Sequence, residues 1–313
     1  IYTDELRLLA WGTDAGFYRL IPKIVIRAKD ENEVSRLLAL ADKYTLPVTF
    51  RAAGTSLSGQ SISDSILIVA GKNWEKYSIS EDFERITLQP GIIGARVNEI
   101  LKPHGRKFAP DPASVKSAMV GGIVMNNASG MNCGTHANSD KELLSAKIVL
   151  ADGTRLNTGD PESRTTFERK HTPFLNKIIE IRDEIRNDNE LSDRIRKKYS
   201  IKNVTGLNLL PFVIYDDPFD IIAHLMVGSE GTLAFLSEVT MKTEHDYPYS
   251  ASAMLYFSNI KDACRAVVAM KPGPVFSAEL LDKKSLASVN DTTGTGLTAV
   301  LTETKADTPE ELQ

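Results

Sequence analysis

A glycine- and serine-rich loop directly after an apolar strand is the feature that most constrains this chain. Residues 51–61 read Arg-Ala-Ala-Gly-Thr-Ser-Leu-Ser-Gly-Gln-Ser, which offers many backbone N–H groups and small hydroxyls. We interpret this segment as a phosphate-binding loop. It matches the nucleotide-binding pattern G-x-x-x-x-G-K-[ST] at Gly54, Gly59 and Ser61, but Gln60 replaces the lysine. A neutral amide cannot neutralise the β- and γ-phosphates of a nucleoside triphosphate, so the loop favours a pyrophosphate ligand.

The composition is that of an ordinary globular protein and disfavours several classes of function. The 313 residues are 42% hydrophobic and 25% charged, which suits two or three domains. A formal net charge of −4 with mixed signs along the chain provides no basic field for nucleic acid. The longest apolar run, residues 66–70, is far shorter than the roughly 20 residues of a membrane helix. We therefore expect a cytoplasmic protein, peripheral to the inner membrane only through partners.

The cysteines and histidines predict neither a disulfide framework nor a metal site. Cys133 and Cys264 are far apart and form no C-x-x-C pair, which fits a reducing compartment. The histidines show no H-x-x-x-H or other metal-ligand spacing, so we expect each to be an isolated surface or core residue. They are His104, His136, His171, His224 and His245.

Two later segments resemble the first loop in composition. Residues 110–140 contain Pro-Asp-Pro-Ala-Ser, Ser-Ala-Met-Val-Gly-Gly and Asn-Asn-Ala-Ser-Gly-Met-Asn-Cys-Gly-Thr-His, almost without bulky charged side chains. Residues 226–235 place Gly228 and Gly231 between apolar segments. Small residues let a backbone approach a ligand closely, and amides suit a flat polar heterocycle as well as phosphates. The alternative is a helix-packing surface or a set of tight turns.

Apolar patterns predict α+β structure around these loops. Residues 21–28 and 48–51 are predicted strands, and the helix between them begins with a capping box of Asp30 and Glu33. The first loop therefore lies at a strand end, where α/β folds bind ligands. Further elements are strands at 66–70, 85–89 and 144–150, and a helix at 91–103.

A charged helical pair and a second β-α-β pattern complete the chain. One predicted surface helix has an apolar stripe of Phe174, Leu175, Ile178, Ile179 and Ile185. The next helix has an apolar stripe of Leu191 and Ile195. We assign His171 and the basic run 194–198 to a solvated face. From about Tyr247 the elements are a strand at 252–257, a helix at 262–270 and a strand at 277–282. The chain begins at Ile1 and ends in what looks like a first helical turn, so we expect an excised fragment.

Taken together and in order, the motifs resemble the FAD-binding domain of the FAD-linked oxidases, which share their flavin fold with vanillyl-alcohol oxidase and p-cresol methylhydroxylase. The motifs are Arg51-x-x-Gly-Thr-Ser, Met119-Val-Gly-Gly with Asn126-Asn127, Val-Leu-Ala-Asp-Gly at 149–153, and Gly-Ser-Glu-Gly-Thr-Leu at 228–233. The run Ser-Gly-Met-Asn-Cys-Gly-Thr at 129–135 resembles the branch of D-lactate and D-2-hydroxyglutarate dehydrogenases with an iron–sulfur segment. A plain glycolate oxidase would instead have a Tyr-Gly pair near His136.

The resemblance implies an α+β fold: a PCMH-type FAD-binding domain of two α+β subdomains, followed by the beginning of an α+β cap domain. The implied division is an N-terminal helical segment at 1–20, a first FAD subdomain at 21–72 and a second at 73–246. The second subdomain contains the helical insertion at about 161–200. Residues 247–313 would be the truncated beginning of a substrate cap.

The resemblance also assigns the loops to parts of the cofactor. Residues 53–59 would hold the FAD pyrophosphate, residues from Pro110 to Gly134 would line the ribityl chain and isoalloxazine, and Glu230 to Leu233 would close over the adenine side or ring edge. The implied cofactor-binding residues are Arg51, Ala53, Gly54, Thr55, Ser56, Leu57, Ser58, Gly59, Gln60, Pro110, Asp111, Ser114, Met119, Gly121, Gly122, Asn126, Asn127, Ser129, Gly130, Gly134, Thr135, Glu230, Gly231 and Leu233.

The implied activity is oxidation of a D-2-hydroxy acid to the 2-oxo acid. A base takes the hydroxyl proton while the Cα hydride passes to flavin N5, and electrons leave to an iron–sulfur segment or a quinone- or cytochrome-linked acceptor. FAD would be noncovalent, because nothing around His136 marks a histidyl-flavin. The catalytic residues and the iron–sulfur cluster are expected beyond residue 313, with Arg51 the best cation near the flavin. The alternatives are a noncatalytic flavin-binding subunit or sensor, a P-loop-like nucleotide-binding protein, and a MurB-like reductase.

Overall fold

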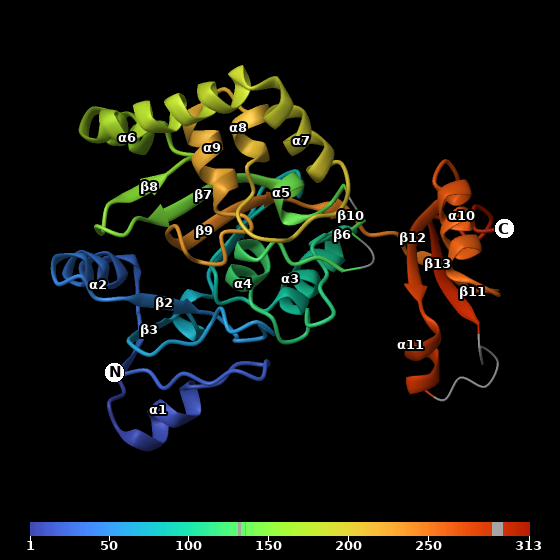
Figure 1. Cartoon of the computed structure of the whole chain (residues 1–313), viewed down its shortest axis with the longest axis horizontal. Helices are drawn as coiled ribbons and strands as arrows, with labels where there is room; N and C mark the ends of the chain where they lie inside the picture. Colours follow the sequence, from blue (N-terminus) through green and yellow to red (C-terminus); the bar gives the residue numbers. More distant parts are fainter. Residues whose placement is uncertain (131–132, 135, 290–296) are drawn as a thin grey trace. The chain divides into compact units, whose positions relative to one another are not determined.

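The computed structural model describes residues 1–130, 133–134, 136–289 and 297–313, and the chain divides into two compact units (Figure 1). The first unit comprises Ile1–Ser129 and Thr135–Glu244, and the second comprises Gly130–Gly134 and His245–Gln313. Thr135 itself lies outside the described residues.

A small parallel sheet carries the first glycine-rich loop. Its strands are β1 (Ile24–Arg27), β2 (Val48–Arg51) and β3 (Ile66–Val69), in the order β1-β3-β2. The helix α2 (Glu31–Lys43) connects β1 to β2. Its predicted start is confirmed, because the Asp30 carboxylate accepts from the Glu33 N–H while the Glu33 carboxylate accepts from the Lys29 N–H. The loop 52–65 links the edge strand β2 to the central strand β3.

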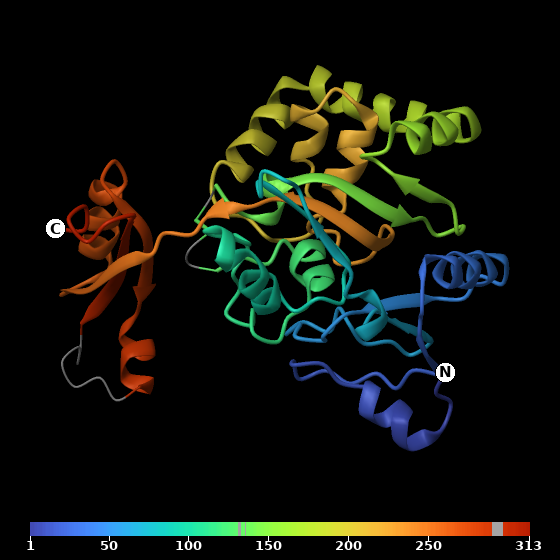
Figure 2. The same ribbon diagram turned by 180° about the vertical axis from the view of Figure 1, so that it is seen from behind.

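A five-stranded antiparallel sheet forms the centre of the first unit. Its order is β4-β5-β9-β7-β8, and α6 to α9 lie on one side of it while α3 and α4 lie on the other (Figures 1 and 2). The strands are β4 (Tyr77–Ile79), β5 (Arg85–Leu88), β7 (Leu143–Val149), β8 (Arg155–Asn157) and β9 (Phe235–Lys242). The strands predicted at 85–89 and 144–150 are thereby confirmed.

The remaining elements of the first unit are short, except for the helix α6. The helices are α1 (Glu5–Trp11), α3 (Gly94–Leu101), α4 (Val120–Met125), α5 (Ser139–Glu142), α6 (Pro161–Asn187), α7 (Asn189–Tyr199), α8 (Leu210–Ile214) and α9 (Pro218–Leu225). The 3-10 turns η1 (Lys72–Trp74) and η2 (Lys102–His104) and the two-residue strands β6 (Arg106–Lys107) and β10 (Glu244–His245) complete the set.

The helix α3 is shorter than the predicted span of 91–103. Residues 91 and 92 form a turn and a bend and Ile93 is extended, because the Val120 N–H donates to the Ile92 carbonyl (2.8 Å) and Ile93 forms an antiparallel bridge with Met119. The other end becomes a 3-10 turn containing Pro103. The spacing of apolar residues in the sequence does not reveal the contacts of Ile92 and Ile93.

An aromatic cluster joins the two sheets. The Phe235 ring packs against Phe50 at 5.1 Å and against Trp74 at 5.0 Å between ring centroids. The Trp74 indole N–H donates to the Ala28 carbonyl at 2.9 Å, so this large buried side chain has its polar atom satisfied. The cluster therefore brings the end of β2 next to the start of β9.

The helical insertion differs from the predicted surface helix. The backbone of α6 is non-helical at His171 (φ −127°, ψ 30°), two residues before Pro173, which lacks the N–H of a regular helix. Leu175, Ile178 and Ile185 are buried as predicted, but Phe174 is 41% exposed because it lies just past this kink. His171 stacks on Phe167 at 4.5 Å rather than belonging to a fully solvated face.

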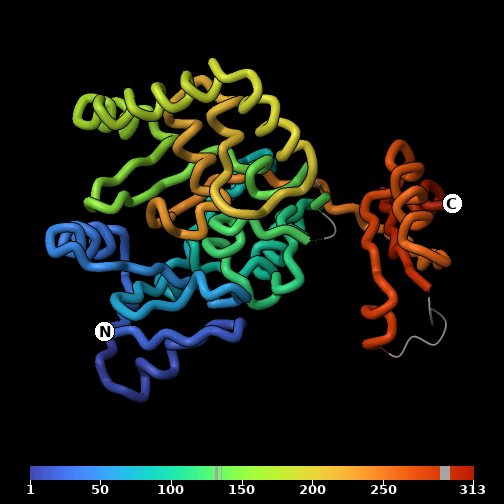
Figure 3. The backbone as a smooth tube through the Cα atoms, in the orientation of Figure 1, coloured from blue at the N-terminus to red at the C-terminus, as the bar shows by residue number. Residues whose placement is uncertain are grey.

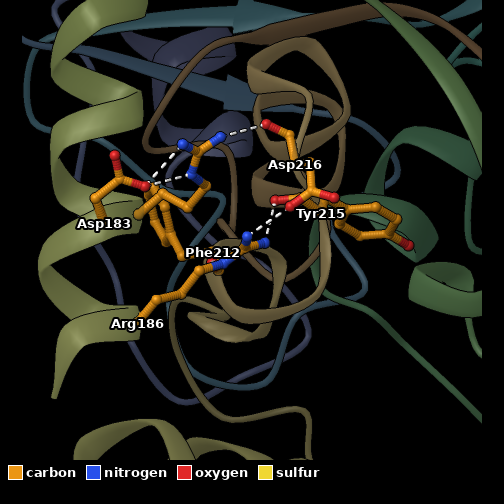
Figure 4. Close-up of polar contacts among 6 residues, drawn as sticks. Asp183, Arg186, Phe212, Tyr215 and Asp216 are labelled. Carbon is orange, nitrogen blue, oxygen red and sulfur yellow. Dashed lines mark hydrogen bonds and ion pairs between the residues drawn. The ribbon is translucent and has the colours of Figure 1, made fainter. Parts of the chain in front are cut away.

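Two arginines of α6 anchor the segment between α8 and α9 (Figure 4). Arg186 donates to the carbonyls of Phe212 (3.0 Å) and Tyr215 (2.6 Å), and Arg182 donates to the Asp216 carbonyl (2.5 Å). The charge pattern suggested a helical insertion that only decorates the surface. The structure differs, because the arginines of the insertion donate hydrogen bonds to backbone carbonyls of the segment between α8 and α9.

The anchored segment leads to a buried tyrosine–histidine pair. The Tyr215 hydroxyl is 2.9 Å from His224 Nε2, and His224 Nδ1 is 2.9 Å from the Asp220 carbonyl. A carbonyl only accepts, so Nδ1 donates and Nε2 accepts from the tyrosine. Burial lowers the pKa of His224, which keeps this imidazole neutral.

The second unit is an antiparallel sheet with two helices. Its strands are β11 (Tyr249–Phe257), β12 (Val275–Leu281) and β13 (Thr298–Ala306), in the order β11-β13-β12. The helices are α10 (Ile260–Met270) and α11 (Lys283–Ser288). The strands and helix predicted from residue 252 to residue 282 are confirmed. Among the helices of the described residues, none combines the length and apolar character needed to cross a bilayer.

Glu142 predicts an unusual pH dependence of stability. Its side chain is buried and Oε2 has no hydrogen-bond partner among the described residues. Burial, then the nearby Glu244 carboxylate, raise the pKa of Glu142 from 4.5 to about 7, with Lys242 and Arg106 opposing. Between these values the folded state binds the proton more tightly than the unfolded state does, so stability falls as pH rises from about 4.5 to about 7.

The substitution Glu142→Gln removes this loss. We expect the variant to match the wild type near pH 5 and to unfold at a higher temperature near pH 8, measured by thermal unfolding at both pH values. Glu168→Gln, on the exposed surface of α6, is the control and should show no such pH-dependent gain. Equal effects of Glu142→Gln at both pH values would contradict the assignment.

Candidate cofactor-binding site

A cavity of 160 Å³ lies where the loop after β2, the helix α4 and the residues before β9 meet. Its lining comes from four parts of the sequence that are far apart. The lining residues are Phe50 to Ser56, Gln60, Ser61, Ala70, Pro90, Ser114, Ala118, Met119, Gly121 to Ile123, Met125, Asn126, Ala128, Glu230, Gly231 and Ala234 to Leu236. The three glycine-rich segments therefore contribute to one cavity.

A second cavity of 520 Å³ shares several of its walls with the first. The shared residues are Phe50, Gln60, Glu230, Gly231 and Ala234. Its other side consists of the last turn of α2, the loop into β2 and the turn after β7. The two cavities together form a two-part candidate site.

The loop after β2 presents backbone N–H groups to the first cavity. Within the described residues, the N–H groups of Ala53 to Leu57 donate no hydrogen bond to the protein. Gly54 and Gly59 adopt left-handed backbone conformations (φ 75° and 81°) that other residues rarely adopt. Consecutive unpaired N–H groups at a turn form a concave site for an anion.

Gln60, the residue in place of the P-loop lysine, has an internal role. The Ser56 hydroxyl donates to the Gln60 side-chain oxygen, which closes the loop on itself. Gln60 lines both cavities, so the loop presents neutral donors where a P-loop presents an ammonium. This arrangement suits a pyrophosphate better than a triphosphate.

The helix α4 packs closely against Pro90 because Gly121 carries no side chain at this contact. A Cβ added to Gly121 would come within 2.6 Å of the Pro90 Cβ, so only glycine fits at this contact. The neighbouring Gly122 also lines the cavity. The Gly-Gly pair thus allows α4 to approach the neighbouring backbone closely, as the small residues of this segment indicated.

Two strained residues tie the second and third glycine-rich segments together. Asn127 and Glu230 both have positive φ (47° and 55°) although neither is glycine. The Glu230 N–H donates to the Met125 carbonyl at 2.8 Å. The Asn127 amide and Asp140 form a reciprocal pair, with Asn127 Nδ2 3.3 Å from Asp140 Oδ1 and Asp140 N 3.4 Å from Asn127 Oδ1. Residues held in such conformations are common at ligand sites.

Several buried polar atoms near these segments have no partner among the described residues. They are Arg51 Nε, Asp111 Oδ1 and Ser129 Oγ. Buried polar atoms are normally hydrogen-bonded, and exceptions point to a partner such as a ligand or a water molecule. All three belong to the residues predicted to bind the cofactor.

The structure brings together many, but not all, of the predicted residues. The first cavity is lined by Arg51, Ala53, Gly54, Thr55, Ser56, Gln60, Ser114, Met119, Gly121, Gly122, Asn126, Glu230 and Gly231. Leu233 lines the second cavity. Leu57, Ser58, Gly59, Pro110, Asp111, Asn127 and Ser129 line neither, while Gly130 and Gly134 group with the second unit. Thr135 lies outside the described residues.

Sequence reasoning missed the apolar part of the site. Phe50, Pro90, Met125 and Phe235 line the first cavity, and Leu38 and Leu46 line the second. These residues look like ordinary strand, helix and turn positions, because a hydrophobic side chain at a cavity has the same local pattern as one in a core. Only Phe50, near the end of the predicted strand 48–51, and Pro90, directly after the predicted strand 85–89, had a local signal.

Comparison with known proteins agrees with this geometry. Residues 22–159 match the family of FAD binding domains. The chain is 25% identical over 303 residues to D-2-hydroxyglutarate dehydrogenase of Haemophilus influenzae, covering 91% of this chain and 28% of that protein. It is 25% identical over 297 residues to the glycolate oxidase subunit GlcD of Escherichia coli, covering 93% of this chain and 49% of the relative.

A third relative and a solved structure extend the comparison. D-lactate dehydrogenase of Archaeoglobus fulgidus is 24% identical over 266 residues, covering 84% of this chain and 48% of that protein. The structure of alkyldihydroxyacetonephosphate synthase superposes with a TM-score of 0.64 at 15% identity, covering 97% of this chain and 53% of that structure. The chain thus spans less than half the length of these three curated relatives.

The family and fold predictions are confirmed. Residues 22–159 match FAD binding domains, and the mixed α and β fold is similar to that of alkyldihydroxyacetonephosphate synthase. The three curated relatives are named as two dehydrogenases and a glycolate oxidase subunit. The same 25% identity to the dehydrogenase and to the glycolate oxidase subunit does not separate the two branches.

The left-handed Gly54 is predicted to be essential for cofactor binding. A Cβ at this position would lie 2.6 Å from the Arg51 Cζ, so Gly54→Ala must displace the loop or the guanidinium. We expect at least a ~10-fold weaker affinity for FAD, measured by quenching of flavin fluorescence on titration.

Gly105→Ala is a matched control for this substitution. Gly105 is also left-handed (φ 64°), but a Cβ there would meet no atom within 4 Å. It should cost only about 1 kcal/mol of stability from backbone strain and leave the FAD affinity unchanged. Equal losses of affinity in both variants would show that the effect of Gly54→Ala is not local.

Proposed function

We propose that this chain is the FAD-binding portion of a flavin-dependent dehydrogenase that oxidises a D-2-hydroxy acid, of the D-lactate or D-2-hydroxyglutarate type, to the 2-oxo acid. The observation that carries the proposal is the convergence of three glycine-rich segments on one two-part cavity at the junction of two sheets. A dinucleotide with two flat ring systems and a central pyrophosphate has the matching shape.

The residues of this site fit the parts of FAD in a consistent order. The unpaired N–H groups of Ala53 to Leu57 would bind the pyrophosphate oxygens. Ser114, Met119, Gly122 and Asn126 would line the flavin side of the first cavity. The second cavity, with Glu230 to Leu233 on one wall, would take the adenine side. Residues 21–72 and 73–246 would then act as two subdomains that enclose one cofactor.

The chemistry of the reaction would come from the bound cofactor, since the flavin ring supplies a two-electron acceptor at N5. The chain's own residues bind and orient that ring and keep water from its enclosed face. Neutral donors such as the Asn126 amide favour negative charge on the reduced ring without needing a cation. None of the residues of this chain is proposed as the base that takes the substrate proton.

The substrate class is proposed from the relatives. Two of the curated proteins are named for D-2-hydroxyglutarate and D-lactate, and both are D-2-hydroxy acids. The run at 129–135 favours the same branch over a glycolate oxidase. Electrons would leave to an iron–sulfur segment or to a quinone- or cytochrome-linked acceptor, and residues 247–313 would begin a substrate-covering domain.

The cofactor test is direct. Purified chain is expected to be yellow, or to become yellow on addition of FAD, with the visible absorption bands of an oxidised flavin. The reaction is then tested on the complete gene product by anaerobic bleaching of these bands with D- and L-2-hydroxy acids. Bleaching by a D-acid supports the proposal, and stable colour with every acid would favour a noncatalytic flavin-binding subunit or sensor. Colourless protein that takes up no FAD but binds ATP would favour the nucleotide-binding alternative.

Noncovalent binding is proposed because His136, the histidine in the second glycine-rich segment, is exposed. Acid precipitation of the yellow protein should therefore release all the flavin into the supernatant, where it is measured by absorbance. Flavin that stays with the protein pellet would contradict noncovalent binding. If FAD is bound noncovalently, the variant His136→Ala should retain the yellow colour.

A further inference from the structure

The N-terminal segment Trp11–Tyr18 lies directly against the loop after β2, and it belongs to none of the cofactor-binding motifs. In Figure 3 this segment runs beside the small parallel sheet. The Ala15 N–H donates to the Gly54 carbonyl at 3.1 Å, on the opposite side of the peptide unit from the cavity-lining amides. A Cβ added to Gly16 would lie 2.6 Å from the Leu57 carbonyl oxygen. The contact is therefore close along several residues.

Arg51 is the centre of this contact. Its Nη1 donates to the Thr13 carbonyl at 2.7 Å and to the Trp11 carbonyl at 3.3 Å, and its Cζ lies 5.2 Å from the centroid of the Trp11 ring. The same guanidinium lies directly under Gly54, where an added Cβ would be 2.6 Å from Cζ. One side chain thus contacts the N-terminal segment and the apex of the phosphate-binding loop at once.

The charges around Arg51 explain why it stays in this position. Burial lowers the pKa of Arg51, and the Asp14 carboxylate partly offsets this effect. Asp14 is itself held by the Gly16 N–H, which donates to Oδ1 at 2.8 Å. The Ser61 hydroxyl lies 3.5 Å from Asp14 Oδ2. The Asp14 carboxylate therefore acts electrostatically on the guanidinium at the start of the loop and lies near the Ser61 hydroxyl at its other end.

We propose that the segment Trp11–Tyr18 is a structural part of the cofactor site, and that Arg51 is a positioning residue that fixes the loop to this segment instead of contacting the pyrophosphate through its charge. This inference rests on the proposed FAD binding and revises the sequence-based role of Arg51 as the cation nearest the flavin. One terminal nitrogen of the guanidinium donates to both carbonyls while the planar group lies near the Trp11 ring, and a compact ammonium on a different stem does not reproduce this combination. The position of the N–H groups of Ala53 to Leu57, which donate to no protein acceptor among the described residues, then depends on residues before the sheet.

A pair of variants at Arg51 separates positioning from direct charge contact. Arg51→Lys keeps the charge, and Arg51→Gln removes it. For a positioning residue both variants lose about 10- to 100-fold in FAD affinity, as expected for the loss of charge-assisted hydrogen bonds. Flavin fluorescence titration gives the dissociation constants. Wild-type affinity in Arg51→Lys together with a loss in Arg51→Gln would overturn the proposal, because it would show that charge alone matters.

A double-mutant cycle tests whether Arg51 acts through the N-terminal segment. Trp11→Ala should weaken FAD binding by about 3- to 10-fold, and Arg51→Gln with Trp11→Ala should be no weaker than Arg51→Gln alone. Phe17→Ala is the matched control, since Phe17 belongs to the same segment and is fully exposed. It should leave the affinity unchanged. Additive losses in the double variant would contradict a shared role.

Protection from protease gives a readout that loss of stability alone does not produce. FAD should slow tryptic cleavage after Arg19, an exposed residue next to the segment, in the wild type and in Phe17→Ala but not in Arg51→Gln at saturating FAD. Equal protection in all three would overturn the coupling. If the wild type binds no FAD, the proposed function fails, whereas FAD binding with unchanged affinity in Trp11→Ala and in both Arg51 variants refutes only this inference.

Discussion

The packing of Phe235 between Phe50 and Trp74 is the interaction on which the candidate site depends. Phe50 and Phe235 belong to different sheets and Trp74 to the turn η1, and their contact sets the position of β2 relative to β9. The first glycine-rich loop follows β2 and the third precedes β9, so the same contact sets the position of both loops. Phe50 and Phe235 also line the first cavity, which makes the joint between the sheets a wall of the site. A change in this packing would alter the fold and the ligand site together.

A site of this kind binds anionic groups without a strong local positive charge. The N–H groups of Ala53 to Leu57 face no protein acceptor among the described residues, and Gln60 is engaged with Ser56. Fixed backbone dipoles are arranged when the protein folds and cost little reorganisation on binding. The folded state instead carries a free-energy cost in the left-handed backbone of Asn127 and Glu230 and in buried polar atoms without a partner, such as Arg51 Nε. The N-terminal segment contacts this loop through backbone carbonyls that accept from Arg51.

Local patterns predicted the elements well and their arrangement poorly. The capping box at Asp30 and the strand periods at 85–89 and 144–150 depend on neighbours within a few residues, and the structure confirms them. The central position of β3 between β1 and β2, the shortened start of α3 and the exposed Phe174 depend on distant pairings or on a kink. Arg182 and Arg186 belong to the helix that the sequence placed at the surface, and nothing within that helix reveals that their partners are carbonyls some thirty residues later.

The sequence by itself determined the type of ligand chemistry. Small residues, positive-φ glycines and a missing lysine are local properties, and they indicate neutral donors for a pyrophosphate wherever the loop lies. Only the tertiary structure decided which residues share a cavity, that apolar side chains such as Phe50 and Met125 belong to it, and that Arg51 contacts Trp11 and Thr13. The physical reason is that a binding site consists of side chains and amides from segments that are far apart in the sequence. Their proximity depends on long-range packing, which the local spacing of apolar residues does not reveal.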